Sequence, residues 1–207
     1  MHRPSCTSAL LTFLVCAPLA SRSPVIAQSL TSGGVHAGVI GGISYPGGVL
    51  KTFAKTDWNA GALVSIGTAT APLSVRFEGQ WNQFDGKPQY AGDRPTEYND
   101  YRIIDATANA VYTFPNRSLA KFYLIAGAGV YSTRLTTRLG STATSTTATR
   151  NGVNGGAGVH LQVSRLATFV ELRYHYIVNG GENVPLGYLG NGRGGLHFYP
   201  LTVGIVL

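Results

Sequence analysis

Residues 73–82 have the sequence LSVRFEGQWN, in which the character of the side chain changes at every step. The odd-numbered positions are apolar or glycine, and the even-numbered positions are polar: Ser74, Arg76, Glu78, Gln80 and Asn82. A period of two residues is typical of a β-strand, because successive side chains of a strand point to opposite faces. The stretch therefore predicts a strand with one apolar face and one charged face.

The same alternation recurs along the rest of the chain. It is clear in three further segments: residues 104–114, 170–176 and 199–207. It is weaker in four more: residues 35–45, 57–68, 121–134 and 152–163. Short connections near residues 69–72, 115–119 and 164–166 alternate with long ones near residues 46–56, 85–100, 136–151 and 177–195. Eight strands joined in this way predict an antiparallel up-and-down sheet with all the long loops at one end.

The composition is unusual for a soluble domain of 207 residues. Charged residues make up 12% of the chain, about half of the usual share, while hydrophobic residues make up 44%. Disorder is excluded, because a disordered chain contains little apolar material. Both cysteines, Cys6 and Cys16, lie near the N-terminus, which excludes a disulfide scaffold or a cysteine metal site in the rest of the chain. We expect a surface that is not wholly in contact with water.

Residues 1–27 have the features of a secretory signal peptide. A basic start with Arg3 precedes an apolar run over residues 9–20, which is too short to span a bilayer. Small and apolar residues then lead to an expected cleavage site after Ala27. Cleavage there would lower the formal net charge from +7 to +5 and leave a cysteine-free domain over residues 28–207.

An open sheet of eight strands would leave two edges, which an up-and-down sheet removes by closing into a barrel. A soluble lipocalin-like ligand binder would have its apolar side chains inside, whereas a transmembrane barrel would have them outside. The interior of an eight-stranded barrel is only just wide enough for side chains, so Phe77, Trp81 and Tyr112 would overfill it. The sequence therefore predicts an all-β fold, an eight-stranded antiparallel up-and-down transmembrane β-barrel, over residues 28–207.

Aromatic residues fall into two groups, and membrane barrels concentrate such residues at both membrane interfaces. One group flanks the short connections: Tyr112, Phe114, Phe122, Tyr123 and Phe169. The other lies near the long loops: Trp58, Trp81, Tyr131, Tyr174, Tyr176, Phe198 and Tyr199. We expect two aromatic girdles. The alternative is a β-sandwich with these residues in its core, since aromatic residues are enriched in strands generally.

The chain resembles the bacterial outer-membrane β-barrel family, which includes small eight-stranded porin-like and OmpA-type transmembrane domains. The matching segments are KFYLIAGAGVY at residues 121–131, GGAGV at 155–159, FVELRYHY at 169–176 and PLTVGI at 200–205. The resemblance implies a protein of the cell outer membrane, inserted by the barrel-assembly machinery among outer-membrane lipids and lipopolysaccharide. The family typically ends in Phe, whereas this chain ends in Leu207, which is apolar and has the right parity.

Six ionisable residues fall on faces predicted to line the lumen: Arg76, Glu78, Asp105, Glu171, Arg173 and His175. Buried charges persist only when they are paired, so we expect an internal salt-bridge network that fills the lumen. Glycines on the same faces would leave room for the long side chains: Gly127, Gly129, Gly156 and Gly158. A narrow porin-like ion path along the same residues is the alternative.

A catalytic alternative rests on His175 and Glu182. They resemble part of the triad of membrane-embedded lipid A deacylase barrels, in which a Ser lies two positions after the His. Here that position is Ile177, which has no hydroxyl for the His to activate. We therefore expect that the protein is not an enzyme.

Other patterns indicate no cofactor, metal or nucleic-acid site. The glycine-rich segments lack the third glycine and the helix of a dinucleotide fingerprint, and the histidines lack a metal-ligand spacing. The positive charges are dispersed along the chain rather than clustered. Three arginines bracket the Thr-rich third long loop: Arg134, Arg138 and Arg150. Two interpretations stay open for them: contacts with lipopolysaccharide phosphates, and solvated loop charges.

The sequence as a whole predicts a monomeric outer-membrane barrel with a packed lumen and a structural, envelope-integrity or surface-interaction role. A narrow channel, a lipid A-modifying enzyme and a soluble lipocalin-like binder are the alternatives. No motif in the four long loops names an extracellular ligand.

Overall fold

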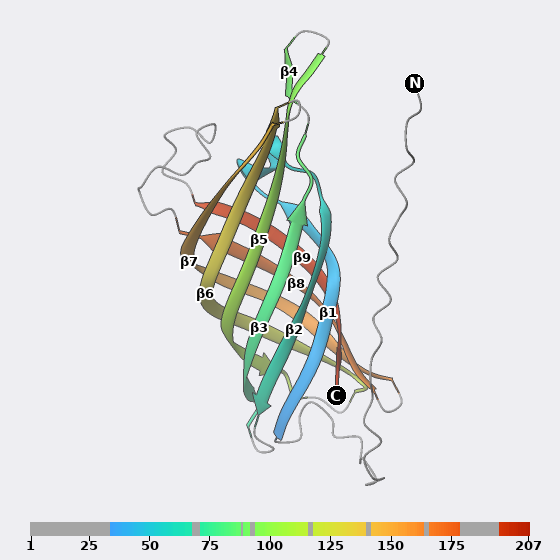
Figure 1. Ribbon diagram of the computed structural model, residues 1–207. Helices are drawn as coiled ribbons and strands as arrows, with labels where there is room; N and C mark the ends of the chain where they lie inside the picture. Colours follow the sequence, from blue (N-terminus) through green and yellow to red (C-terminus); the bar gives the residue numbers. More distant parts are fainter. Residues whose placement is uncertain are drawn as a thin grey trace, which may run out of the picture.

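The computed structural model describes residues 34–67, 71–87, 89–91, 94–115, 118–139, 142–163, 166–178 and 195–207, so the expected signal peptide lies outside the described residues. Within these ranges the chain forms nine β-strands and one short helix (Figure 1). The strands are β1 (Gly34–Pro46), β2 (Asp57–Gly67), β3 (Leu73–Phe84), β4 (Gln89–Ala91), β5 (Arg94–Thr113), β6 (Ala120–Leu139), β7 (Thr142–Val163), β8 (Leu166–Ile177) and β9 (Leu196–Val206); the helix is α1 (Leu50–Phe53). No helix in the described part of the chain has the length and apolar character needed to cross a membrane.

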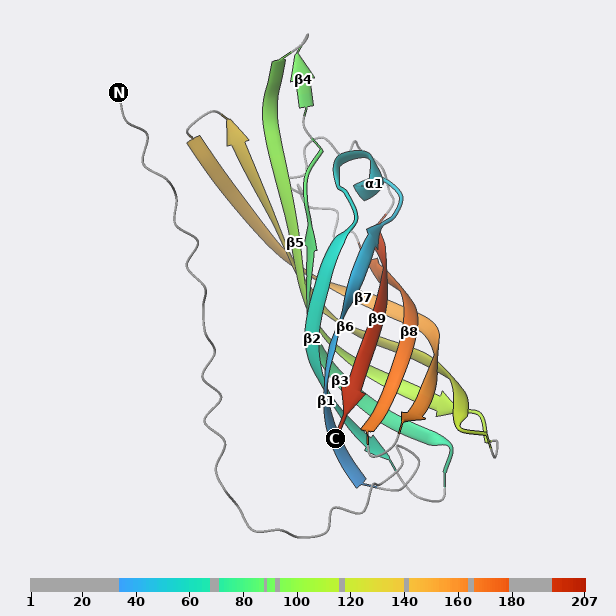
Figure 2. The same ribbon diagram turned by 90° about the vertical axis from the view of Figure 1, so that its right-hand side faces the viewer.

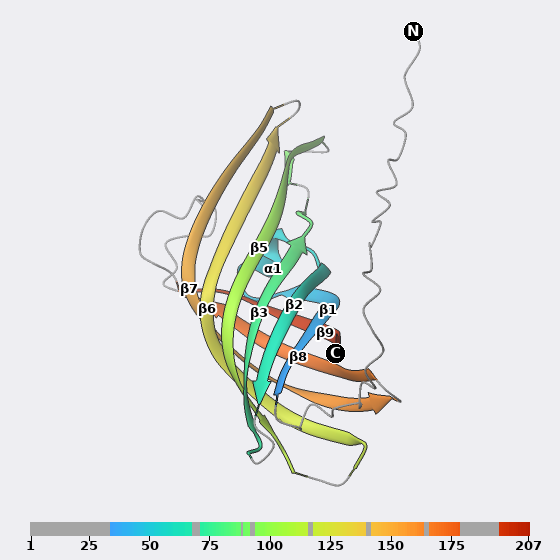
Figure 3. The same ribbon diagram turned by 60° about the horizontal axis from the view of Figure 1, so that its bottom comes forward.

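Eight of these strands close into a barrel. They pair antiparallel in the order β1-β2-β3-β5-β6-β7-β8-β9, and β9 pairs in turn with β1 (Figures 1 and 3). The short β4 pairs with the first residues of β5 and lies beyond the barrel wall. The predicted eight-stranded antiparallel up-and-down barrel is confirmed.

The barrel has two distinct ends. The terminal end holds Gly34 and Leu207 together with the last residues of β2, β5 and β7. The loop end holds α1 and β4, together with the tip of a long hairpin made by β6 and β7 (Figure 2). The described parts of the connections after β1, β3 and β6 therefore lie at the same end, as the alternation of short and long connections predicts.

The two faces of the wall divide as the sequence alternation predicts. On β3, Arg76 and Glu78 are buried inside, while Phe77 between them is 49% exposed on the outside. On β8, Glu171 is buried and Leu172 is 53% exposed. An apolar band that continues around a closed barrel is typical of a wall that faces lipid.

Three strands run further than the sequence analysis predicts. Residues 94–103 belong to β5, and β6 and β7 stay paired as far as Leu139 and Thr142. The long loops predicted over residues 85–100 and 136–151 are therefore partly wrong. Thr is β-branched and favours extended backbone, but residues 142–147 are exposed on both faces of the hairpin. A strand with water on both faces has no apolar alternation, which is the signal that the prediction used.

Candidate functional site

Two arginines and two glutamates meet inside the barrel. Arg76 and Glu78 come from β3, and Glu171 and Arg173 come from β8. Three strands separate β3 from β8 in either direction around the wall, so the two strands face each other across the lumen. Arg76 forms an ion pair with Glu171 at 2.8 Å, and Arg173 forms one with Glu78. We call these four buried residues the lumen network.

Neighbouring groups fix Glu171 at the centre of the lumen network. Its carboxylate also pairs with Arg173, so it bridges the two arginines. The Tyr123 hydroxyl donates a hydrogen bond of 2.6 Å to Oε2 of Glu171. The guanidinium of Arg76 lies over the Phe169 ring, 4.9 Å from its centroid. Buried charges cost folding free energy unless they are paired and hydrogen-bonded, and this arrangement supplies both.

Asp105 and His175 lie in the same lumen but are held by neutral side chains. Asp105, on β5, accepts a hydrogen bond of 3.0 Å from the amide of Asn82. Nδ1 of His175 lies 3.0 Å from the Tyr131 hydroxyl, and the imidazole ring stacks on Phe198 with centroids 4.7 Å apart. The structure thus brings four of the six predicted residues into one set of ion pairs and places the other two beside it.

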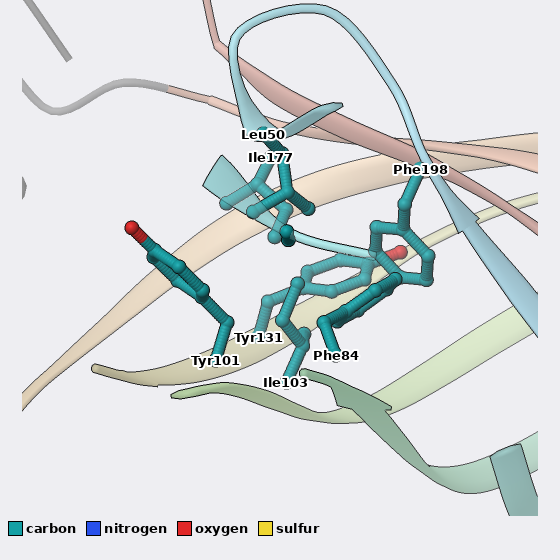
Figure 4. Packing of buried hydrophobic residues seen from close by; sticks show 8 residues of the cluster. Leu50, Phe84, Tyr101, Ile103, Tyr131, Ile177 and Phe198 are labelled. Carbon is teal, nitrogen blue, oxygen red and sulfur yellow. The ribbon is translucent and has the colours of Figure 1, made fainter. Parts of the chain in front are cut away.

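An apolar layer that was not among the predicted features fills the lumen at the loop end. Figure 4 shows side chains from α1 and five strands meeting there; the layer consists of Leu50, Ala54, Phe84, Tyr101, Ile103, Tyr131, Ile177 and Phe198. Leu50 is the buried residue of α1, so the connection between β1 and β2 folds back onto the lumen. We call this cluster the loop-end layer.

A second apolar layer fills the lumen at the terminal end. It consists of Ile40, Leu63, Val111, Tyr123, Ile125, Phe169 and Val206. The lumen network lies between the two layers: the inward positions of β3 run from Arg76 and Glu78, next to the terminal-end layer, to Phe84 in the loop-end layer. Buried side chains therefore occupy the lumen along its length.

The prediction that all the aromatic residues form girdles is wrong for four of them. Tyr123, Tyr131, Phe169 and Phe198 are buried inside the barrel. The alternation along β8 already indicates this burial, because Phe169 lies two positions before the inward-pointing Glu171 and therefore points to the same face. The remaining expected members lie on the outer face: Tyr112, Phe114 and Phe122 at the terminal end, and Trp58, Trp81, Tyr174, Tyr176 and Tyr199 at the loop end.

Two of the four glycines predicted to make room for large inward side chains, Gly156 and Gly158, do so; the other two, Gly127 and Gly129, lie against backbone and short side chains of β5. A Cβ on Gly158 would lie 2.4 Å from the ring of Tyr123. A Cβ on Gly156 would lie 2.7 Å from Cγ of Arg173. Neither distance is sterically allowed, so β7 must carry glycine at these two positions for the opposing side chains to fit.

The residues of the catalytic alternative lie in a packed environment. His175 is fully buried, and Ile177 belongs to the loop-end layer. Glu182 lies outside the described residues. Among the residues that the structure describes, no group of three or more His, Cys, Asp or Glu side chains could hold a metal ion.

The three arginines predicted at the third long loop do not form one cluster. Arg134 is exposed on the outer face of β6. Arg138 lies on the same face and forms an exposed ion pair of 3.4 Å with Asp100. Arg150 pairs in register with the inward-pointing Tyr131, so it lies on the inner face of β7.

A fourth arginine, Arg102, joins the outer face at this level. It lies directly opposite Arg134 in the β5–β6 register, and its guanidinium lies 4.5 Å from the centroid of the Trp81 ring. Trp81 in turn stacks on Trp58, with centroids 6.4 Å apart. Arg102 is not among the predicted site residues because the predicted strand begins at residue 104, although the alternation of that strand continues back to residue 102.

Acidic groups lie close together at the loop end, where β2 and β5 meet the residues after β3. Burial raises the pKa of the Asp85 carboxyl above its ordinary value, and the carboxylates of Asp57 and Asp100 raise this pKa further. The positive charge of Lys55 lowers the pKa of Asp85. Repulsion between neighbouring carboxylates is thus built into the loop end.

A family model described as "Outer membrane protein beta-barrel domain" matches residues 7–205. The chain belongs to this family. It is an outer-membrane β-barrel protein, and the cell outer membrane is where it resides. The apolar band around the wall is the surface that faces lipid, and the predicted family resemblance is confirmed.

Solved structures show the same fold for this outer-membrane barrel. Neisserial surface protein A (NspA) matches with a TM-score of 0.52 and 19% sequence identity, over 84% of this chain and 96% of that one. A major outer membrane protein from Thermus thermophilus matches with a TM-score of 0.56 and 10% identity, over 84% and 98% of the two chains. A comparison of this sequence with curated proteins found no match. The similarity to the solved structures concerns the fold alone.

Proposed function

We propose that this outer-membrane barrel has a structural or surface-interaction role, conducts no ions through its lumen and has no catalytic activity. The observation that carries the proposal is the filling of the lumen by the lumen network and two apolar layers. An eight-stranded barrel has an interior just wide enough for its own side chains, so a lumen occupied in this way leaves no continuous aqueous path. Asp105 and His175, which are bonded to Asn82 and Tyr131, add to the filling of the lumen.

Conductance in planar lipid bilayers tests the closed lumen. The refolded wild-type barrel, checked by heat-modifiable migration on a gel, should give no reproducible single-channel currents. Reproducible currents of uniform size from the wild type would favour the porin-like channel and end the proposal. The same preparation should elute from size exclusion in detergent as one barrel, because we propose that the protein is a monomer.

The mass of lipid A tests the alternative that the barrel is a lipid A-modifying enzyme. Expression of the barrel in a host that makes lipopolysaccharide should leave the mass of lipid A unchanged. A changed mass that reverts in the His175→Ala variant would support the enzyme instead. The position of Ile177 in the loop-end layer supports the non-catalytic proposal, since an alkyl side chain offers no nucleophile.

We place the surface interaction at the loop end. The β6–β7 hairpin presents exposed Thr and Ser hydroxyls beyond the barrel, and function in such folds is carried by loops on a rigid scaffold. We also propose that Arg134, with Arg102 beside it, contacts lipopolysaccharide phosphates. Arg138 and Arg150 contribute less, because one is paired with Asp100 and the other lies on the inner face. Unchanged co-purification of lipopolysaccharide with the Arg134→Glu variant would contradict these contacts.

Export and insertion complete the proposal. Residues 1–27 are removed, and the barrel-assembly machinery inserts the remaining chain with Leu207 in place of the usual terminal Phe. Depletion of that machinery should convert the heat-modifiable form on a gel to the unfolded form. The Leu207→Phe variant should insert at least as fast as the wild type, and slower insertion would contradict the part given to the last residue.

A further inference from the structure

A cavity of about 580 Å³ opens at the loop end beside β1 and β9. Its wall combines three lysines with two tyrosines: Lys51, Lys55, Lys87, Tyr45 and Tyr199. Neither the lumen network nor the outer-face arginines take part in it. We call it the lysine cavity.

Backbone hydrogen bonds bring the three lysines together from two distant loops. The Lys55 N–H donates to the carbonyl of Asp85 at 2.7 Å, and the Lys87 N–H donates to the carbonyl of Phe53 at 2.7 Å. The Lys87 ammonium donates to the carbonyl of Lys51, also at 2.7 Å. Because like charges repel, this convergence depends on the bonds that join the loop after β1 to the residues after β3.

The loop that carries Lys51 is fixed on both sides. The Gly47 N–H donates to the carbonyl of His197 at 3.0 Å. Gly48 has a φ of +47°, and a Cβ there would lie 2.4 Å from the His197 ring. Leu50, one position before Lys51, is buried in the loop-end layer. The cavity is therefore part of the folded barrel rather than a gap between loose loops.

Two of the three cavity lysines take part in none of the ion pairs formed by the described residues. Asp85 interacts electrostatically with Lys55. Within the described ranges, neither Lys51 nor Lys87 lies within ion-pair distance of a carboxylate. An ammonium has three N–H donors, and Lys87 uses one of them on the Lys51 carbonyl. The remaining donors suit an anion with several oxygen atoms, such as a phosphate.

The tyrosines place the cavity at the boundary between lipid and water. Tyr45 and Tyr199 are direct partners in the β1–β9 register, and they are 41% and 39% exposed on the face that meets lipid. Tyrosine at such a boundary has its ring toward the acyl region and its hydroxyl toward the headgroups. A soluble anion would contact the lysines alone, whereas a lipid with a phosphate headgroup would contact both the lysines and the tyrosines.

We propose that the lysine cavity binds the phosphate of a phosphorylated glycolipid in the outer leaflet. Lys51, Lys55 and Lys87 hold the phosphate oxygens, and Tyr45 and Tyr199 pack against the part of the lipid that enters the membrane. The site is separate from the lumen, so its failure leaves the closed-barrel proposal untouched. It is equally separate from the proposed contacts of Arg134.

Binding of purified diphosphorylated lipid A to the folded barrel in detergent, measured by native mass spectrometry, tests the site. The K51Q/K55Q/K87Q variant should bind lipid A at least ~10-fold more weakly than the wild type, since it removes the three cations that hold the phosphate oxygens. The charge-matched control is R117Q/K121Q/R165Q, which removes three positive charges whose sequence positions lie between β5 and β6, at the start of β6, and between β7 and β8. This control should stay within about 2-fold of the wild type.

The outcomes separate the site from general attraction and from a soluble ligand. Wild-type affinity in the lysine variant, or an equal loss in the control, overturns the proposal. If inorganic phosphate at equal concentration displaces lipid A, the site recognises free phosphate, and the proposal that the phosphate belongs to a lipid is overturned. The Y45A/Y199A variant should lose affinity for lipid A, and full affinity would contradict the lipid-facing wall. If the triple variant does not fold, K51Q/K55Q retains the Lys87 hydrogen bond and gives the same test.

Discussion

Arg76 and Glu171 form a buried ion pair of 2.8 Å although 95 positions separate them in the chain. Two residues further along each strand, Glu78 and Arg173 form a second pair. The order of charges on β3, Arg then Glu, is the reverse of the order on β8, Glu then Arg. Each positive group therefore meets a negative one across the lumen.

The first prediction concerns the cost of breaking this complementarity. Arg173→Met leaves Glu78 and Glu171 buried without their shared partner, so it should lower the free energy of unfolding by about 3–5 kcal/mol. The charge swap E78R/R173E keeps opposite charges facing each other across the lumen and should recover part of this loss, because Glu171 still loses its contact with Arg173. Urea titration followed by tryptophan fluorescence measures both. Arg134→Met, on the outer face, is the control and should change stability by less than about 0.5 kcal/mol.

A second prediction treats the lumen network, the loop-end layer and the apolar layer at the terminal end as three barriers in series. Removing only the charges (R76A/E78A/E171A/R173A) or only the apolar contacts of the loop-end layer (L50A/F198A) should give no currents in a planar bilayer, because the other barriers remain. Combining these six substitutions with Y123A/F169A in the terminal-end layer should give measurable single-channel currents, provided that gel migration shows a folded barrel. Currents from the L50A/F198A variant alone would show that neither the charged layer nor the terminal-end layer blocks ions.

Two adjacent glycines on β7 give a matched pair of substitutions. Gly156 faces the lumen, and a Cβ there would lie 2.3 Å from the carbonyl oxygen of Leu172. Gly155 faces outward, and its nearest atom would be the carbonyl oxygen of Ile125 at an ordinary 3.7 Å. Gly156→Ala should therefore destabilise the barrel by about 1–3 kcal/mol, whereas Gly155→Ala should be neutral or slightly stabilising. Equal effects in urea unfolding would contradict the packing of Gly156 against β8.

Asp85 provides a prediction about pH. Because burial and the charge of Asp57 raise the pKa of Asp85 in the folded barrel, the folded state holds this proton more tightly than the unfolded state. The wild type should gain stability as the pH falls from neutral through this raised pKa. Asp85→Asn should remove that gain and raise stability at neutral pH by less than about 1 kcal/mol. Lower stability of the variant at neutral pH would be the contrary result.

The alternation of side chains was sufficient to predict the barrel and its facing. Parity alone places Arg76, Glu78, Glu171 and Arg173 inside, and the structure brings these four together. The same parity places Phe169 and Tyr123 inside as well. The girdle prediction for these two residues relied on where aromatic residues usually lie in membrane barrels. It ignored the alternation of inward and outward positions in their own strands.

Other features of the structure could not be predicted from the alternation of apolar and polar residues. Pairing between particular residues depends on the position of β3 relative to β8 around the wall, and no segment of sequence contains that information. The helix α1 has four residues, too few for a helical period, and its buried residue Leu50 lies in a predicted loop. The β6–β7 extension has water on both faces, so its residues show no alternation.

The position of β3 opposite β8 bears on how the barrel assembles. In a partly formed sheet, three strands keep β3 and β8 apart, so Arg76 and Glu78 remain hydrated and contribute nothing to its stability. Their partners come within reach only when β9 joins β1 and the ring is complete. The four charges therefore act as a latch that stabilises the finished ring and none of its precursors, and removing them should speed the opening of the barrel more than it slows the formation of its hairpins.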